Sequence, residues 1–81
     1  MNQQLIKIID SFAERIEETF GLNKAALIHG SLHVWRKNLD PNISNIKKEF
    51  QKEAISILKK IIGLNKSEAK AIVKEFLDEI F

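Results

Sequence analysis

The sequence predicts an all-α fold of four helices, arranged as two helical hairpins in one bundle-like domain. Three observations support this prediction. Apolar residues recur at helical spacing through most of the chain. The 81 residues include one Pro and three Gly, too few for a turn-rich β fold. Hydrophobic residues make up 44% and charged residues 30%, which is enough apolar material for one small core.

The first hairpin is expected to cover about residues 3–39. Its first helix, at about 3–20, carries an apolar stripe of Leu5, Ile9, Phe12, Ile16 and Phe20. Gly21 is expected to end this helix as a left-handed cap, and Asn23 to begin the next. Gly30 lies inside that second helix, at a cost of up to about 1 kcal/mol relative to Ala. The stripe of the second helix is Leu27 or Ile28, Leu32, Trp35 and Leu39.

The second hairpin is expected to cover about residues 41–81. Asp40 can cap a third helix with Pro41 in its first position, or the helix can begin at Ser44. This helix should run to about Ile62. Its inward positions are Ile46, Phe50, Ala54, Ile57 or Leu58, and Ile61.

A fourth helix should follow the turn at Gly63. Asn65 and Glu68 have the spacing of a capping box, in which each side chain binds the backbone N–H of the other residue. The apolar face of this helix is Ala69, Ile72, Val73, Phe76, Leu77 and Ile80.

The two hairpins share a local motif with an offset of 42 residues. The run 20–24 reads Phe-Gly-Leu-Asn-Lys and the run 62–66 reads Ile-Gly-Leu-Asn-Lys. One interpretation is an internal repeat. The alternative is that any two helical hairpins joined at a Gly cap look alike, and the sequence leaves both open.

Residues 52–81 of the second hairpin contain a series of short motifs. Its elements are Glu53 and Ile55, the turn Gly63-Leu64-Asn65-Lys66, the pair Glu68-Ala69, and then Val73 and Phe76. In this pattern residues 52–81 resemble the N-terminal helical dimerisation hairpin of the HU/IHF nucleoid-protein family. The resemblance implies a helical scaffold that dimerises and is associated with DNA. This sequence has no strand signal and no basic β-arm, so the family's main DNA-contacting residues do not carry over.

Lysines are concentrated in the second half of the chain. Residues 1–40 hold five basic and five acidic residues, whereas residues 41–81 hold eight and six. A lysine ridge that could contact phosphates is formed by Lys59, Lys60, Lys66, Lys70 and Lys74. The formal net charge is only +2. The chain has two Arg, the residue type that most often reads guanine, so it has few residues suited to base-specific contacts. Solvated lysines are the alternative interpretation.

Two histidines are the strongest candidates for chemistry. His29 and His33 lie four residues apart, so in a helix they share a face on which zinc or nickel could bind. A third ligand would have to come from elsewhere, such as Asp40. The chain has no Cys, and no Glu lies between the two histidines. We therefore expect the histidines to face solvent or a partner, and we expect no metal and no cofactor.

No catalytic constellation is visible in the sequence. Ser31 and His29 point to different sides of a helix, as residues two apart do. The first helix has an acidic outer face, which we expect to be solvated, formed by Asp10, Glu14, Glu17 and Glu18. The chain is therefore not expected to be an enzyme.

Self-association is expected because so short a chain leaves apolar surface uncovered. The C-terminal run and the single Trp are the candidate interface residues: Trp35, Phe76, Leu77, Ile80 and Phe81. For Trp35 the stripe that it shares with Leu32 and Leu39 favours a core role over an interface role.

The sequence thus predicts a small non-enzymatic helical interaction or regulatory module that binds itself, another protein, or both. The alternative is a DNA-associated protein that binds phosphates through the lysine ridge. The N-terminus has no targeting signal, and apolar runs of three or four residues fall far short of the roughly 18 needed to cross a bilayer. We therefore expect a cytoplasmic protein.

Overall fold

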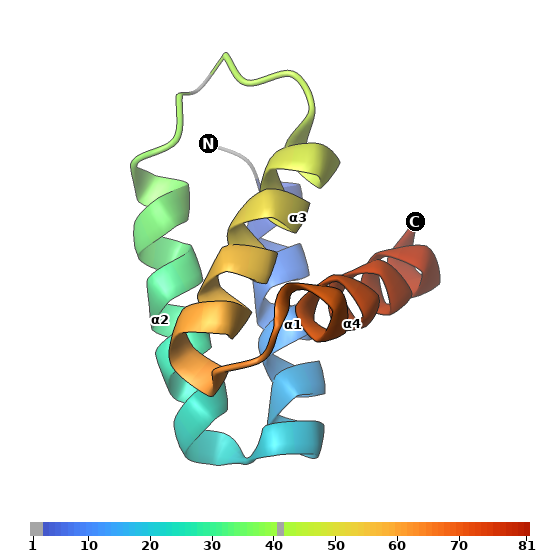
Figure 1. Cartoon of the computed structure of the whole chain (residues 1–81). Coiled ribbons are helices and arrows are strands. Elements are labelled where there is room, and N and C mark those ends of the chain that lie inside the picture. The colour runs from blue at the N-terminus through green and yellow to red at the C-terminus, as the bar shows by residue number, and fades with distance from the viewer. Residues whose placement is uncertain (1–2, 41) are drawn as a thin grey trace. The chain divides into compact units, whose positions relative to one another are not determined.

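The computed structural model describes residues 3–40 and 42–81, which contain four α-helices and no strand (Figure 1). The predicted all-α fold class is confirmed. In chain order the elements are α1 (Gln3–Phe20), α2 (Leu22–Lys37), α3 (Ile46–Ile57), the π-helical turn η1 (Leu58–Ile62) and α4 (Lys66–Ile80). The chain divides into two compact units, Met1–Ser44 and Asn45–Phe81.

A single residue, Gly21, joins α1 to α2. Its N–H donates to the carbonyl of Glu17 at 3.0 Å, and its carbonyl accepts from the N–H of Ala25 at 3.1 Å. Gly21 therefore belongs to the hydrogen-bonding pattern of both helices. Its φ of 96° and ψ of 166° lie in a region that is essentially restricted to glycine.

Two details of the predicted turn were therefore wrong. Gly21 has a positive φ, but its ψ is extended rather than left-handed helical. Asn23 does not cap α2, because the helix has already begun at Leu22. The physical reason is that one glycine in this conformation reverses the chain by itself, which leaves no residue over for a separate N-cap.

α1 and α2 run antiparallel and pack against each other along an apolar seam (Figure 1). The predicted stripe of α1 is buried except at Phe20, which is half-buried. The sequence left open whether Leu27 or Ile28 belongs to the buried stripe of α2. Ile28 is fully buried, whereas Leu27 is 60% exposed. The buried residues of the two helices are Leu5, Ile8, Ile9, Phe12, Ala13, Ile16, Ala25, Ile28 and Leu32. Burial of each large side chain contributes about 1.5–3 kcal/mol to folding.

The segment before α3 forms a turn and then a cap. The carboxylate of Asp40 accepts a hydrogen bond from the N–H of Asn42 at 2.8 Å. Asn45 is the N-cap, and its side-chain oxygen accepts from the N–H of Lys48 at 3.0 Å. The predicted starts at Pro41 and Ser44 were therefore too early, because the side chain of Asn45 satisfies the first turn of α3 instead. Pro41 itself lies outside the described residues.

The caps of the second unit follow the sequence prediction. α3 passes into η1, which ends at Gly63 with φ 84° and ψ 21°, the expected left-handed cap. The side chain of Asn65 accepts from the N–H of Glu68 at 2.8 Å, and the N–H of Asn65 donates to the carboxylate of Glu68 at 3.1 Å. The predicted capping box at the start of α4 is confirmed.

The second unit is more open than an antiparallel hairpin, because α4 is steeply inclined to α3 (Figure 1). The rings of Phe50 and Phe76 meet in its core, with centroids 6.1 Å apart and an interplanar angle of 44°. The buried residues of this unit are Phe50, Ala54, Ile57, Leu58, Ala69, Val73, Phe76 and Leu77.

The two glycine turns differ in geometry although they share a sequence motif. Gly21 directly adjoins a helix on both sides, whereas Leu64 and Asn65 separate Gly63 from α4. The ψ angles of the two glycines also differ, at 166° and 21°. The repeated motif therefore does not produce a repeated turn.

Replacing Gly21 should destabilise the fold, because a side chain is strained at its backbone angles. We expect Gly21→Ala to lower the free energy of unfolding by about 1–3 kcal/mol, measured by urea denaturation followed by circular dichroism. Gly30→Ala is the matched control, since Gly30 lies inside α2 with no neighbouring atom within 4 Å of an added Cβ. The control should raise stability by up to about 1 kcal/mol. Equal effects of the two changes would contradict this account of the turn.

Candidate functional site

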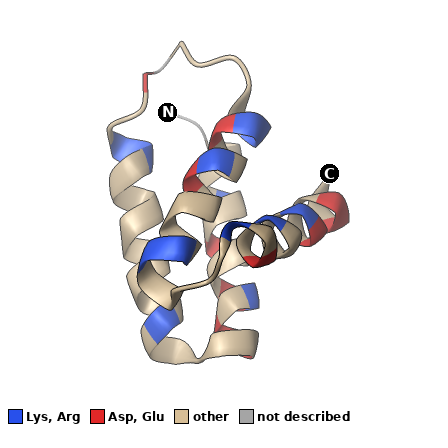
Figure 2. Ribbon diagram, in the orientation of Figure 1, with Lys and Arg blue, Asp and Glu red and all other residues tan. Residues whose placement is uncertain are grey.

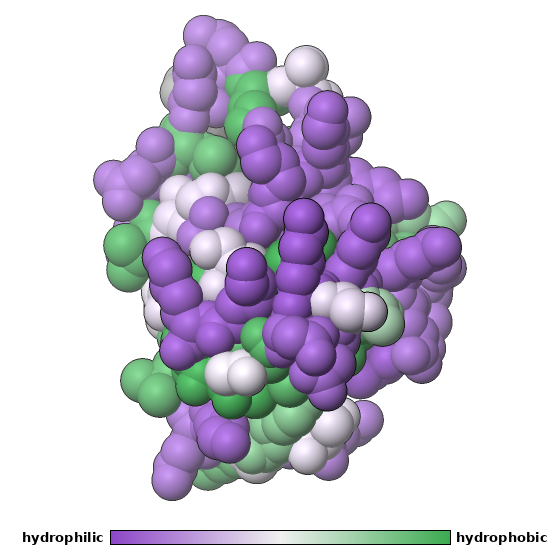
Figure 3. Space-filling model, viewed as in Figure 1, coloured by the Kyte–Doolittle hydropathy of each residue, from purple (hydrophilic) through white to green (hydrophobic). Residues whose placement is uncertain are grey.

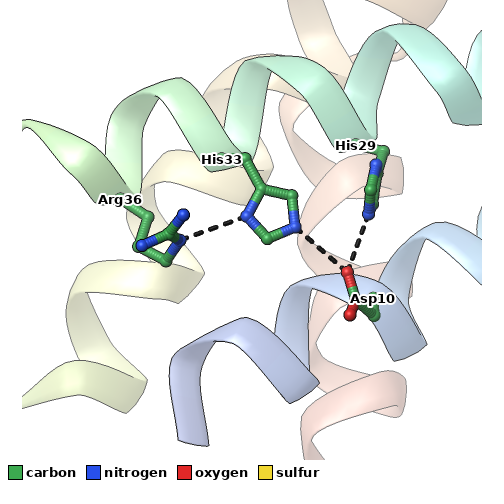
Figure 4. Close-up of polar contacts among 4 residues, drawn as sticks. All are labelled: Asp10, His29, His33 and Arg36. Atoms are coloured by element: carbon green, nitrogen blue, oxygen red, sulfur yellow. Dashed lines mark hydrogen bonds and ion pairs between the residues drawn. The ribbon is translucent and has the colours of Figure 1, made fainter. Parts of the chain in front are cut away.

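Two imidazoles of α2 converge on one carboxylate oxygen of α1 (Figure 4). The Nε2 of His29 lies 2.7 Å from the Oδ1 of Asp10, and the Nε2 of His33 lies 3.0 Å from the same atom. The imidazole rings meet edge to face, with centroids 4.5 Å apart and an interplanar angle of 79°. We call Asp10, His29 and His33 the Asp–His cluster.

The hairpin geometry brings these residues together. His29 and His33 are one helical turn apart, so they lie on the same side of α2. Asp10 lies eleven residues before Gly21, and the histidines lie eight and twelve residues after it. In an antiparallel pair, residues at similar distances from the turn face each other. The cluster therefore follows from the tight connection between α1 and α2.

Arg36 extends the cluster along α2. Its Nε–H donates to the Nδ1 of His33 at 3.1 Å (Figure 4). Because Nδ1 accepts this bond, the proton of the neutral ring is assigned to Nε2, which then donates to Asp10. The two hydrogen bonds of His33 thus select one tautomer.

The Asp–His cluster is open to solvent. The side chains of His29, His33 and Asp10 are 44%, 20% and 53% exposed. The hydrogen bonds from His33 and then His29 hold the pKa of Asp10 below its ordinary value. Asp10 is therefore ionised at neutral pH and available as an acceptor or ligand.

The third member of the cluster is not the residue that the sequence suggested. Asp40 was considered as a partner of the histidines, but its carboxylate is bound to the turn at Asn42. Asp10 had been placed on a solvated acidic face, and it is indeed exposed, yet it contacts both histidines. Asp10 and the histidines lie at similar distances from Gly21, but this identifies the contact only once the one-residue turn is known.

The expected lysine ridge is solvent-accessible throughout. All five of its residues are exposed: Lys59, Lys60, Lys66, Lys70 and Lys74. The three lysines of α4 follow one another at four-residue intervals, so they line one side of the helix. Acidic residues lie on the same helix (Figure 2), and Asp78 continues the four-residue spacing of the lysines.

The expected C-terminal interface divides into a buried and an exposed part. Phe76 and Leu77 are each 2% exposed and belong to the core, because they lie on the face of α4 that packs on α3. Ile80 and Phe81 are 43% and 53% exposed, and the ring of Phe81 lies 5.3 Å from the Nζ of Lys47. Trp35 is half-buried.

A second apolar surface lies on α2, opposite its seam with α1. Leu27 and Val34 are 60% and 61% exposed and lie two helical turns apart. Gly30 is exposed between them, and Ala26 is exposed one turn before Gly30. We call these four residues the α2 outer face. α2 contains no acidic residue (Figure 2), and hydrophobic side chains protrude along its outer side (Figure 3).

The chain matches no known family model, and no curated protein or solved structure is significantly similar to it. Within residues 3–40 and 42–81, none of the helices combines the length and the apolar character that a membrane span requires.

The hydrogen bond between Asp10 and His33 should contribute little to the stability of the fold, because both side chains are accessible to water. We expect Asp10→Asn to lower the free energy of unfolding by less than about 1 kcal/mol, measured by urea denaturation in the presence of a metal chelator. A double-mutant cycle with His33→Gln isolates the pairwise contribution. A loss of several kcal/mol would show that the cluster holds the hairpin together.

Proposed function

We propose that this chain is a small, non-enzymatic helical interaction module that associates with a second copy of itself through the α2 outer face. The observation that carries the proposal is the exposure of Leu27 and Val34 on the side of α2 that faces away from α1. Isolated exposed apolar residues are ordinary, but a contiguous apolar surface on a small protein is typical of an interaction site.

The shape of this surface favours a partner helix. Gly30 lies between Leu27 and Val34, and nothing approaches within 4 Å of the position where a Cβ would stand. Gly therefore has no packing role inside the chain at this point, and it destabilises the helix relative to Ala. A helix of a second molecule could approach the backbone there and pack between the two large side chains.

Basic residues border the α2 outer face. The basic residues Lys24 and Lys37 lie near the two ends of α2, and both are exposed. Among the described helices of the first unit, acidic side chains occur on α1 and not on α2. In a two-fold pair the same surface of both copies meets, so these lysines would lie around the contact, and salt that screens them should favour association.

The solvent exposure of the Asp–His cluster supports a non-enzymatic role. A catalytic acid or base works best when burial and neighbouring charges tune its pKa, and all three side chains of this cluster are accessible to water. Ser31 is two residues from each histidine along α2, which directs its hydroxyl away from both.

DNA association through the lysine ridge is the second candidate function. The exposure of its five lysines and the regular spacing on α4 favour it. This candidate agrees with the similarity of residues 52–81 to the HU/IHF dimerisation hairpin, and it requires a dimer as well. The low net charge of +2 places it second.

Self-association should disappear when charge is placed on the α2 outer face. We expect Leu27→Glu and Val34→Glu to convert an oligomer into a monomer, measured by sedimentation equilibrium over a concentration series. Ile80→Glu is the matched control, because Ile80 is an exposed apolar residue of α4 and does not belong to the α2 outer face. A wild-type chain that is monomeric at high concentration, or equal effects of all three changes, would refute the proposed interface.

The DNA alternative makes a separate prediction about salt. If the lysine ridge binds phosphates, affinity for a random-sequence duplex should fall steeply as salt rises, as measured by fluorescence anisotropy. Changing Lys66, Lys70 and Lys74 together to Gln should weaken binding and reduce the salt slope by about 2–3. The control is a variant in which Lys7, Lys24 and Lys37 are changed together to Gln. It has the same net charge as the first variant but leaves the lysine ridge intact. Undetectable or salt-independent binding would exclude this function.

A further inference from the structure

We infer that Asp10, His29 and His33 form a binding site for a divalent transition-metal ion of the zinc class. The inference is independent of self-association, because all three groups belong to the hairpin of one chain. Each residue offers one ligand atom, and these atoms all lie within 4.8 Å of one another. Imidazole nitrogen and carboxylate oxygen are the ligands that such ions take in proteins.

The spacing of the ligand atoms suits a single ion. Zinc bonds to nitrogen and oxygen are about 2.0–2.2 Å long, which places tetrahedral ligands roughly 3.4 Å apart. The two histidine nitrogens lie 2.7 and 3.0 Å from Asp10 Oδ1, somewhat closer than this value. The limit of 4.8 Å, within which all three ligand atoms lie of one another, is somewhat longer than the tetrahedral spacing. Small side-chain rotations would therefore bring all three atoms to bonding distance.

The positions of the ligands on the backbone support a preformed site. His29 and His33 are fixed one turn apart by α2, and Asp10 is held opposite them by α1. An unfolded chain would not hold these residues together, so an ion would bind the folded hairpin preferentially. Solvent exposure of the cluster gives an ion a direct entry path and leaves further coordination positions for water.

The ligand chemistry selects the class of ion. Two imidazoles and one carboxylate suit Zn²⁺, Co²⁺, Ni²⁺ or Cu²⁺. Mg²⁺ and Ca²⁺ prefer shells composed entirely of oxygen. An excess of Mg²⁺ should therefore not displace the bound ion.

Arg36 opposes metal binding in this arrangement. A neutral histidine that binds a metal through Nε2 carries its proton on Nδ1, and that proton normally points at an acceptor. Here the Nδ1 of His33 faces a donor, the Nε–H of Arg36, at 3.1 Å. The ion must therefore displace Arg36 from His33, and the guanidinium charge is also unfavourable next to a cation. Removal of Arg36 should strengthen binding.

The test is a titration of the full-length chain with Zn²⁺ in competition with a chromophoric chelator. We expect one ion per chain, and a thermal midpoint that rises with zinc concentration. His29→Gln, His33→Gln and Asp10→Asn should each weaken binding at least tenfold, with unchanged circular dichroism spectra. Arg36→Met should tighten binding by about tenfold or more.

A matched control separates this site from general binding to surface carboxylates. Asp40→Asn changes the other aspartate that the sequence associates with the histidines, and Asn can retain the turn contact to Asn42. This variant should bind zinc as the wild type does. Absence of saturable binding overturns the inference, as does one ion per two chains or an affinity that the three ligand changes leave intact. An unchanged affinity of Arg36→Met would refute the role given to Arg36.

Discussion

The structure of the first unit depends on the chain reversal at Gly21. One residue with a φ of 96° and a ψ of 166° ends α1 and begins α2 without an intervening loop. Such a short connection fixes which residues of the two helices face each other. It aligns the apolar seam, and at the edge of that seam it places Asp10 opposite His29 and His33. The same reversal directs Leu27 and Val34 away from α1, so the cluster and the α2 outer face have a common origin.

α2 is unusual because apolar side chains occur on more than one of its sides. Ile28 and Leu32 are buried in the seam, while Leu27 and Val34 reach solvent. A helix of this kind is well packed within its own chain on one side and can still contact a partner on another. The histidines lie between these two sides, half-buried, where a polar group can pair with α1 and remain accessible to water. The two proposals for this unit therefore concern different sides of one helix.

The second unit shows how far local sequence signals extend. The capping box of Asn65 and Glu68 and the left-handed conformation of Gly63 were both predicted, because each depends on residues within a few positions of one another. The start of α3 was misplaced by several residues for a related reason. Asp40, Ser44 and Asn45 are all suitable helix caps, and the preference for Asn45 depends on how the preceding turn uses Asp40.

The sequence by itself determined the helical class, the approximate limits of the helices and most of the buried positions, because helical periodicity and caps are properties of neighbouring residues. It did not determine whether Leu27 or Ile28 was buried, since the two are neighbours in the sequence and the seam can be assigned to either one until the pairing of the helices is known. Nor did it determine that Asp10, rather than Asp40, meets the histidines. That contact joins residues 19 and 23 positions apart, and it depends on the conformation of one glycine between them. Only the tertiary structure decides it, because the distance between residues on different helices depends on how the chain reverses and not on their spacing in the sequence.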